Sequence, residues 1–322
     1  MSQPTSSPQP TAKVGQLILA PMEGVMDHLM RDLLTALGGY DLCVTEFIRI
    51  VDRGLPERVF YRYAPELYHG GVTSNGTPVR IQLLGQEPAA MAENAVTAIE
   101  LGSAGIDLNF GCPAKAVNKS RGGASLLKQP ELIYQVIHAV RQAVPQPHVV
   151  SAKMRLGWDD TSLLDETIDA INQAGASSLV VHARTKVQGY KPPAHWHELK
   201  AIRQRAAMPV IANGDIVDAD SAQRCIAASG CQHLMLGRGA LALPNLAQVV
   251  RGSEKAMTWS QVQALLVRYS HYEVEGDKGL YYPNRIKQWL SYLRQRYQQG
   301  DELFKSIRRL KRSDEIVAIL CR

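Results

Sequence analysis

One cysteine of this sequence lies where a thiol could exchange a proton with a substrate. Cys112 stands between Gly111 and Pro113, just after an apolar run. Cys43 lies inside such a run, which is typical of an inert core cysteine. A thiol on a loop restrained by glycine and proline can act as a general acid or base. The pattern predicts a catalytic thiol, with an ordinary buried cysteine as the alternative.

Other reactive side chains lie at the ends of short apolar runs. Lys153 could form a Schiff base, pair with a carboxylate or offset the negative charge of a cofactor. His182 is either a site residue or a hydrogen-bonded core histidine. Two later runs end in Asn213-Gly214-Asp215 and Gly237-Arg238-Gly239. Glycine lets backbone N–H groups approach a phosphate and arginine adds donors, so these ends predict a phosphate site, with tight turns as the alternative.

These side chains need a scaffold that brings several strand ends together. Eight short apolar or β-branched runs alternate with helical patterns, and they lie at 16–20, 42–46, 79–84, 105–109, 148–154, 178–182, 210–213 and 233–236. Runs that are apolar almost throughout are typical of parallel strands covered on both faces. Eight such units fit a (β/α)₈ TIM barrel, whose reactive groups lie at the carboxyl ends of its strands. A doubly wound sheet would usually show fewer strands or an early G-x-G-x-x-G turn, which this sequence lacks.

The chain divides into three predicted parts. Residues 1–13 are rich in Ser, Pro and Gln, which predicts a disordered tail without the apolar stretch of a signal peptide. Residues 14–250 form the predicted barrel domain. Residues 251–322 form a predicted all-α domain with helices at 260–275, 282–297, 301–311 and 314–320, the second and third separated at Gly300-Asp301.

Composition limits the class of protein. With 322 residues, 45% hydrophobic and 20% charged, the chain is long and apolar enough for a folded core. No apolar run approaches the ~20 residues that cross a membrane, so we expect no membrane-spanning segment. Five cysteines without a C-x-x-C pair argue against a disulfide framework and a zinc site. We therefore expect a cytoplasmic protein without a metal centre.

The excess positive charge is concentrated in one segment. The whole chain has 36 Lys+Arg and 30 Asp+Glu, a net charge of +6, and residues 285–312 alone contain nine basic and two acidic residues. One predicted helix there has an apolar stripe flanked by basic side chains; the stripe is Ile286, Trp289, Leu290, Leu293 and Tyr297. The pattern predicts binding to a polyanion, with a solvated surface helix as the alternative.

Six segments at these strand ends together resemble the tRNA-dihydrouridine synthases: LAPMEGVMD (19–27), DLNFGCPAKAVNKSRGGASLL (107–127), AKMRLGW (152–158), VVHARTKVQGY (180–190), IANGD (211–215) and MLGRGAL (235–241). The resemblance extends from about Leu17 to Ile319. It implies an FMN-bearing TIM barrel followed by a helical domain. It also implies that the chain reduces a uridine of tRNA to dihydrouridine, with NADPH as the electron donor.

The resemblance also implies roles for single residues. Cys112 corresponds to the catalytic acid, which protonates C5 of uracil after hydride passes from FMN N5 to C6. The implied FMN-binding residues are Pro21, Met22, Gln82, Lys153, His182, Asn213, Gly214, Asp215, Gly237 and Arg238. Asn109 and Tyr190 are expected to orient the flipped-out nucleotide. Phe110 departs from the family pattern, in which a smaller residue stands, and could alter the packing beneath Cys112.

Segments 45–52 and 285–293 most resemble the bacterial C type of this family, which modifies uridine 16 in the D-loop. The resemblance implies that four basic residues set the orientation of the bound tRNA: Arg49, Arg285, Lys287 and Arg308. We expect the protein to act as a monomer.

Three other functions stay open from the residues alone. The first is an FMN-dependent barrel oxidoreductase for a small molecule, similar to dihydroorotate dehydrogenase, which leaves the basic helical segment without a use. The second is a sugar-phosphate lyase that forms a Schiff base through Lys153 without flavin. The third is an RNA-binding protein whose barrel is inactive.

Overall fold

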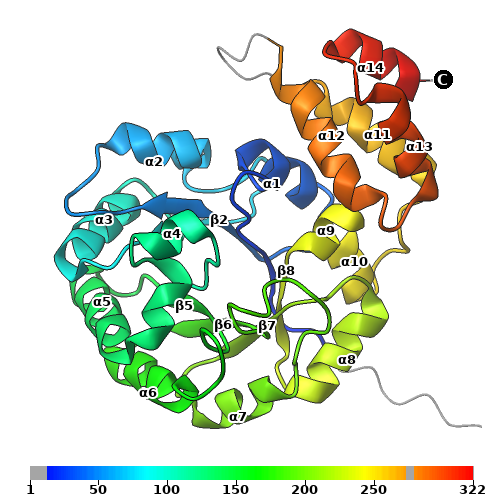
Figure 1. Cartoon of the computed structure of the whole chain (residues 1–322). Coiled ribbons are helices and arrows are strands. Elements are labelled where there is room, and N and C mark those ends of the chain that lie inside the picture. Colours follow the sequence, from blue (N-terminus) through cyan, green and yellow to red (C-terminus); the bar gives the residue numbers. More distant parts are fainter. Residues whose placement is uncertain (1–12, 273–278, 322) are drawn as a thin grey trace, which may run out of the picture.

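The structure is a computed structural model that describes residues 13–272 and 279–321. Its strands are β1 (Leu17–Leu19), β2 (Leu42–Arg49), β3 (Val79–Leu84), β4 (Ile106–Phe110), β5 (Val150–Arg155), β6 (Ser178–His182), β7 (Val210–Asn213) and β8 (His233–Leu236). All eight are parallel neighbours in chain order, and β1 closes the ring by pairing with β8 (Figure 1). The predicted TIM barrel is confirmed.

Strands β3, β6, β7 and β8 have the predicted bounds, and the ends of β1, β4 and β5 differ from the prediction by one or two residues. The larger difference is β2, which was expected to end at residue 46 and continues to Arg49. The pairing of β2 with β3 shifts register between Val44 and Phe47. The strand continues through this irregularity beyond the half-buried Glu46, and Phe47 and Ile48 are buried.

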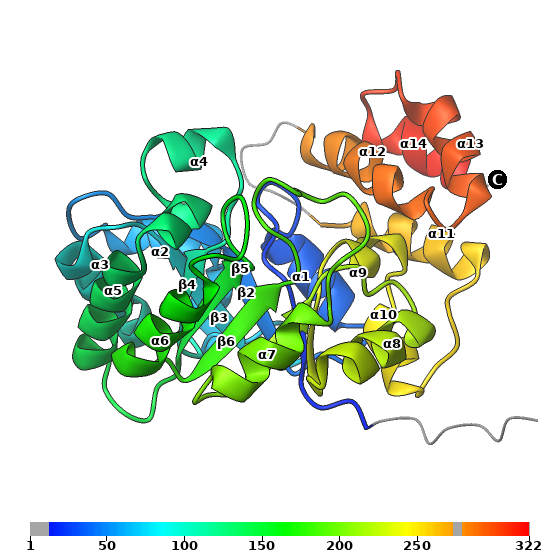
Figure 2. The same ribbon diagram turned by 60° about the horizontal axis from the view of Figure 1, so that its bottom comes forward.

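Helices and short 3-10 turns connect the strands and cover the outside of the barrel (Figure 2). They are α1 (His28–Thr35), α2 (Glu57–Tyr63), η1 (Pro65–His69), α3 (Pro88–Glu100), α4 (Lys115–Lys119), η2 (Gly123–Lys128), α5 (Pro130–Ala143), α6 (Leu164–Ala174), α7 (Glu198–Arg205), α8 (Ala219–Ser229), α9 (Arg238–Ala242) and α10 (Leu246–Arg251). Their starts follow local rules: Pro88 and Pro130 occupy first helical positions, and Asp218 forms a capping box with Ser221.

The interior of the barrel has an apolar part and a polar part. Side chains alternate between the two faces of each strand, so every second residue points inward. Ile18, Ala20, Leu42, Val44, Val180, Ile211 and Met235 form one buried cluster inside the ring. Strands β3 to β5 contribute buried Arg80, Asp107 and Ser151, which are joined by hydrogen bonds. The polar part therefore lies on one side of the interior.

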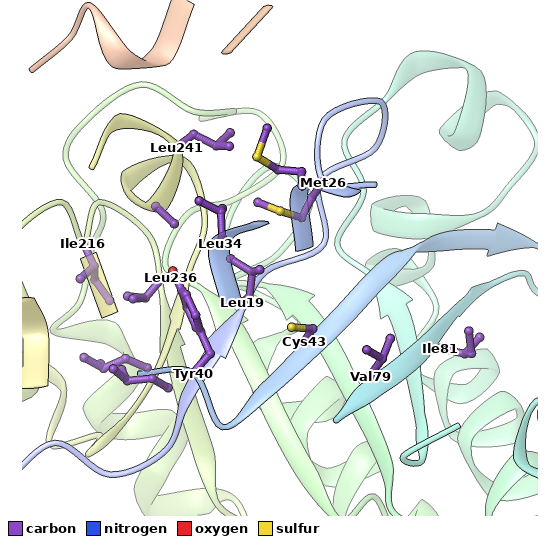
Figure 3. Close-up of a cluster of buried hydrophobic side chains, with 14 of the residues drawn as sticks. Leu19, Met26, Leu34, Tyr40, Cys43, Val79, Ile81, Ile216, Leu236 and Leu241 are labelled. Carbon is purple, nitrogen blue, oxygen red and sulfur yellow. The ribbon is translucent and has the colours of Figure 1, made fainter. Parts of the chain in front are cut away.

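The main core lies outside the ring, between the strands and the helices. Leu19 of β1, Leu34 of α1 and Leu236 of β8 belong to this cluster (Figure 3). Cys43 is fully buried in it, as expected for a structural cysteine, and burial raises the pKa of its thiol to about 12. The outer cluster holds the helices on the ring and fixes the loops between them.

Four further helices form the C-terminal helical module: α11 (Trp259–Tyr269), α12 (Tyr281–Leu293), α13 (Gln298–Ile307) and α14 (Ser313–Leu320). The predicted apolar stripe of α12 is buried. Trp289 at its centre donates a hydrogen bond from Nε1 to the carbonyl of Leu241 on α9, at 2.9 Å. The stripe thus packs the module against the barrel instead of only against other module helices.

The expected helix ends in the module were partly wrong. α11 ends at Tyr269, before the expected residue 275, which lies outside the described residues. α12 ends at Leu293, and Gly300-Asp301 lies within α13 instead of between the two helices. A side chain at Gly300 would place its Cβ 3.2 Å from the backbone nitrogen of Arg294. This glycine therefore permits close packing of α13 against the end of α12 and does not end a helix.

Tyrosine hydroxyls join the module to α1. Tyr281 donates to Asp27 Oδ2 and Tyr272 donates to Asp32 Oδ2, each at 2.7 Å. The other carboxylate oxygen of Asp27 accepts from the backbone of Met30 and caps α1. The first helix of the barrel therefore carries the attachment site of the module. None of the described helices is long and apolar enough to span a membrane.

A buried ion pair holds the start of α1 against η1. Arg31 is fully buried, and its guanidinium donates to both carboxylate oxygens of Glu66 at 2.9 and 3.0 Å. Glu66→Ala would leave this cation buried without its partner. We expect a loss of about 3–5 kcal/mol in the free energy of unfolding, measured by urea denaturation.

The matched control removes an exposed partner. Asp169 pairs with Arg205 on the surface, so water already screens that pair. Asp169→Ala should leave the unfolding midpoint nearly unchanged. Equal midpoints for the two variants would contradict the structural importance of the Arg31–Glu66 pair.

Candidate active site

A cavity of about 760 Å³ opens at the carboxyl ends of the strands. All of the residues that were predicted to bind a cofactor line it, and so do Asn109, Cys112 and Tyr190. They come from seven strands and the loops that follow them. The helical module and α4 both stand at this end of the barrel (Figure 2). The tertiary structure therefore gathers the predicted cofactor and nucleotide residues, which are spread over more than 200 residues of sequence, into one place.

Cys112 is held by the backbone of its loop. Its N–H group and that of Gly111 donate to Asn109 Oδ1, both at 2.9 Å, and its carbonyl accepts from Ala124 at 3.1 Å. Arg155 Nε donates to the carbonyl of Gly111 at 2.8 Å. Burial raises the pKa of the Cys112 thiol. A thiol with a raised pKa keeps its proton at neutral pH and can donate it.

Phe110 does not reach the cavity. Its side chain is buried in the outer cluster, between β4 and the helices. Alternation along β4 explains this, because Asn109 points inward and the next residue must point outward. The departure from the family pattern therefore affects packing outside the ring.

Lys153 lies beside the polar groups of the neighbouring strands. Its amine donates to Asn213 Oδ1 at 3.3 Å, while Asn213 Nδ2 donates to the carbonyl of Met235 at 2.8 Å. Burial, reinforced by the nearby Arg155, lowers the pKa of Lys153 to about 8. No carboxylate of residues 13–272 and 279–321 forms an ion pair with this amine, so it is available to an anion bound in the cavity.

His182 is buried beside several cations. Burial first, and then Arg155 and Lys153, hold the pKa of His182 well below its usual value, so its ring is neutral. Its Nδ1 atom is buried and has no hydrogen-bond partner among the described residues. An unpartnered buried polar atom in a cavity wall fits a ligand that supplies the partner.

The ends of β7 and β8, which were predicted to bind a phosphate, lie together in the cavity wall. Gly214 and Gly237 line the cavity without side chains, and Gly214 has a φ of +123°, which favours glycine. Asp215 pairs with buried Arg184 and lies 3.5 Å from Arg238. Because a carboxylate repels phosphate, Asp215 is suited to hold the Arg238 guanidinium in place, and that guanidinium is suited to bind an anion at this end of the cavity.

Two guanidinium groups lie close to the ring of Tyr190. Arg155 and Arg238 each lie 5.0 Å from the centre of its ring, and His182 meets it edge-on at 5.9 Å. Such cation–π contacts fix the ring while it stays half exposed at the cavity mouth. An exposed, fixed aromatic ring is suited to stack on a nucleic-acid base.

These features fit the flavin mononucleotide that the sequence implies. The cavity has room for a ring system, its walls carry Lys153 and the unpartnered His182 Nδ1, and its β7–β8 end combines glycines with Arg238. Residues 13–272 and 279–321 contain no group of three or more His, Cys, Asp or Glu side chains that could hold a metal ion.

The sequence interpretation assigned no role to three residues of the site. Arg155 lies two positions after Lys153, so the alternation of β5 points both side chains inward, and this signal was available in the sequence. Tyr292 and Gln295 reach the cavity from α12 and the turn after it. Their participation depends on how the module docks, which no local pattern reveals.

The four residues that were predicted to orient tRNA lie outside the cavity lining. Arg49 contacts Ser120, and Lys287 donates to the carbonyl of Leu310. Arg285 pairs with Asp27 at 2.7 Å and donates to the carbonyl of Gly24. Arg308 follows α13 with an exposed side chain. Three of the four thus already have contacts within the chain, and their binding to tRNA stays a prediction.

Comparison with known proteins gives consistent matches. A family model described as dihydrouridine synthase matches residues 18–320. The chain is 53% identical over 305 residues to a tRNA-dihydrouridine(16) synthase of Shewanella oneidensis, covering 95% of this chain and 97% of that protein. It is 56% identical over 302 residues to the protein of the same name from Escherichia coli, covering 94% and 96%.

Among solved structures, histamine dehydrogenase from Rhizobium sp. 4-9 aligns with a TM-score of 0.57 at 13% identity. The alignment covers 74% of this chain and 46% of that one. At this identity the likeness supports the barrel fold alone.

The lowered pKa of Lys153 predicts a pH dependence of stability. Between about pH 8 and the ordinary lysine pKa of about 10.4, the folded state has released this proton and the unfolded state still holds it. The unfolded state then binds more protons, so the stability of the flavin-free protein rises with pH in this window, by up to about 3 kcal/mol. Lys153→Met should remove that rise, measured by urea denaturation at pH 7.5 and 10.

Lys200→Met is the matched control, because it removes an exposed lysine of α7. It should keep the rise of the parent protein. The interpretation fails if Lys153→Met and Lys200→Met gain the same stability between the two pH values.

Proposed function

The chain belongs to the dihydrouridine synthase family, and we infer from this membership that it reduces uridine 16 of tRNA to 5,6-dihydrouridine. It does so as an FMN-dependent oxidoreductase with NADPH as the electron donor. One observation supports the chemistry of this inference: the Cys112 thiol lines the same cavity as the predicted flavin-binding residues. The small-molecule dehydrogenase, lyase and inactive-barrel interpretations are set aside by the family.

Each part of the cavity has a proposed task. When bound, FMN supplies the hydride that saturates the uracil ring. Lys153 offsets negative charge on the flavin, and Arg238, with the backbone at Gly214 and Gly237, binds its phosphate. Pro21, Met22, Gln82, His182 and Asn213 complete the flavin site, and Asp215 contributes by holding Arg238.

Cys112 supplies the proton that completes the reduction. Its raised pKa keeps the thiol protonated, and its place in the cavity wall lets it face a uracil base brought in from outside. The proton passes from Sγ to C5 of the uracil, which leaves a thiolate that must regain a proton before the next turnover. Tyr190 stacks on the incoming nucleotide and Asn109 helps to orient it.

The substrate base lies in folded RNA and must leave its stack to reach the cavity. We propose that residues 14–250 form the catalytic domain and residues 251–322 the tRNA-binding domain, with Arg49 contributing from the barrel. Arg308, Lys287 and Arg285 would contact the phosphate backbone. One chain supplies both domains, so we propose a monomer, and its tRNA substrate favours the cytoplasm.

Cys112→Ala should abolish dihydrouridine formation and still bind FMN and tRNA, because the side chain is small and its backbone contacts remain. A loss of about 10²–10⁴-fold in turnover is expected for a general acid. Dihydrouridine in unmodified tRNA transcript is measured by mass spectrometry, and FMN by its absorbance. Cys321→Ala, at an exposed cysteine, is the control and should retain full turnover. Turnover by Cys112→Ala near that of the parent would rule out the thiol as the acid.

Arg308→Gln should weaken tRNA binding through the loss of one phosphate contact. The slope of log affinity against log salt concentration is expected to become less steep by about one. Lys200→Gln, on the other side of the barrel, is the charge-matched control and should leave the slope unchanged. An unchanged slope for Arg308→Gln would remove this residue from the tRNA-binding surface.

A further inference from the structure

We infer that Asp107 is a positioning residue for the Cys112 thiol and that it acts through the buried amides of Gln82 and Asn109. These four residues are called the Cys112 relay below. The inference concerns how the thiol is held, while the role of the thiol as an acid rests on the proposed function.

The relay runs from the barrel interior to the loop after β4. Gln82 Nε2 donates to Asp107 Oδ2 at 2.7 Å, and Asn109 Nδ2 donates to Gln82 Oε1 at 2.8 Å. Asn109 Oδ1 then accepts from the backbone N–H groups of Gly111 and Cys112. Gln82, Asp107 and Asn109 are 0%, 1% and 8% exposed, so bulk water cannot replace these partners.

The relay ends at the backbone of the Cys112 loop and at the Asp107 carboxyl group. Both ends favour one and the same orientation of the Gln82 and Asn109 side-chain amides. Backbone N–H groups only donate, so they require the oxygen of Asn109 and turn its nitrogen toward Gln82. Gln82 must then present its oxygen to Asn109 and its nitrogen to Asp107, whose Oδ2 accepts. Reversing both amides would set two donors against each other at the loop and two oxygens against each other at Asp107. The relay therefore has one favourable arrangement.

Asp107 is itself held on its other side. Ser151 Oγ donates to Asp107 Oδ1 at 2.6 Å, and Arg80 Nη1 donates to Ser151 Oγ at 3.1 Å. Arg80 also donates from Nε to the carbonyl of Ala104. These groups fix the Asp107 carboxyl group in the polar part of the barrel interior. The position of that carboxyl group then sets the orientation of the Gln82 and Asn109 amides, and the Asn109 amide holds the backbone at Cys112.

The test measures how firmly the loop holds the thiol. The full-length chain carries Cys321→Ser in every variant, since Cys321 is exposed and would react, whereas Cys43, Cys225 and Cys231 are buried. Alkylation of Cys112 by iodoacetamide is followed by mass spectrometry from pH 6 to 10. The assay requires neither tRNA nor turnover, so its result is independent of whether the protein makes dihydrouridine.

Gln82→Met interrupts the relay with a side chain of similar size. Without Gln82 Oε1, the Asn109 amide is no longer held in the orientation that binds the backbone of Gly111 and Cys112. The loop then holds the Cys112 thiol less firmly, and its alkylation should become about three- to tenfold faster, the equivalent of one lost hydrogen bond. Asp107→Leu removes the acceptor at the far end and should accelerate alkylation to a similar extent. Asp107→Asn keeps an oxygen for Gln82 and should restore a rate near that of the parent.

Ser103→Ala is the matched control. Ser103 Oγ accepts from the backbone of Ile81 and donates to the carbonyl of Gly105, so it joins the same two strands, β3 and β4, without belonging to the relay. The control should lose stability and keep the parent rate of alkylation. If Asp107→Leu does not fold, Gln82→Met decides. The inference is overturned if a folded Gln82→Met reacts at the parent rate, or if Ser103→Ala reacts as fast as Gln82→Met.

Discussion

Closure of eight parallel strands into a ring is the constraint on which the site depends. Hydrogen bonding between neighbouring strands sets a register in which Asn109 pairs with Lys153, and His182 pairs with both Arg155 and Asn213. Because the side chains of all these residues point into the barrel, the register brings them together at one end of the interior. A shift of one residue in any strand would turn its polar group outward into the apolar layer.

The ring also decides how charge is distributed around the cavity. Arg31 and Arg184 are fully buried, and each pairs with a carboxylate, Glu66 or Asp215. Lys153 donates to an amide oxygen and Arg155 to three carbonyl oxygens, and neither forms an ion pair with a carboxylate of the described residues. The cavity wall therefore keeps positive charge that the protein does not neutralise, which is suited to an anionic cofactor and to the phosphates of a nucleic acid.

The joint between the barrel and the helical module links binding to the site. Asp27 caps α1, accepts a hydrogen bond from the Tyr281 hydroxyl and forms an ion pair with Arg285, both on α12. Gly24, whose carbonyl accepts from Arg285, belongs to the loop after β1, near the cavity-lining Pro21 and Met22. Part of the positive charge of the module is thus engaged at its attachment to the barrel. The sequence counted Arg285 among the basic residues expected to bind RNA. The structure shows that Arg285 also attaches the module to the barrel, through Asp27 and the carbonyl of Gly24.

The sequence by itself determined the eight strands and the strand ends at which polar and reactive side chains gather. Parallel buried strands leave apolar runs, and in a closed barrel the reactive groups lie where those runs end, so local pattern was sufficient for this much. The resemblance to a family added Pro21, Met22 and Gln82, which line the cavity. It did not determine the end of α12, the place of Gly300 within α13, or the approach of Tyr292 to the cavity, because these depend on packing between segments distant in sequence. The orientation of the Gln82 and Asn109 amides was likewise decided only by the tertiary structure. Each amide takes its direction from a partner on another strand or loop, and no run of neighbouring residues encodes that choice.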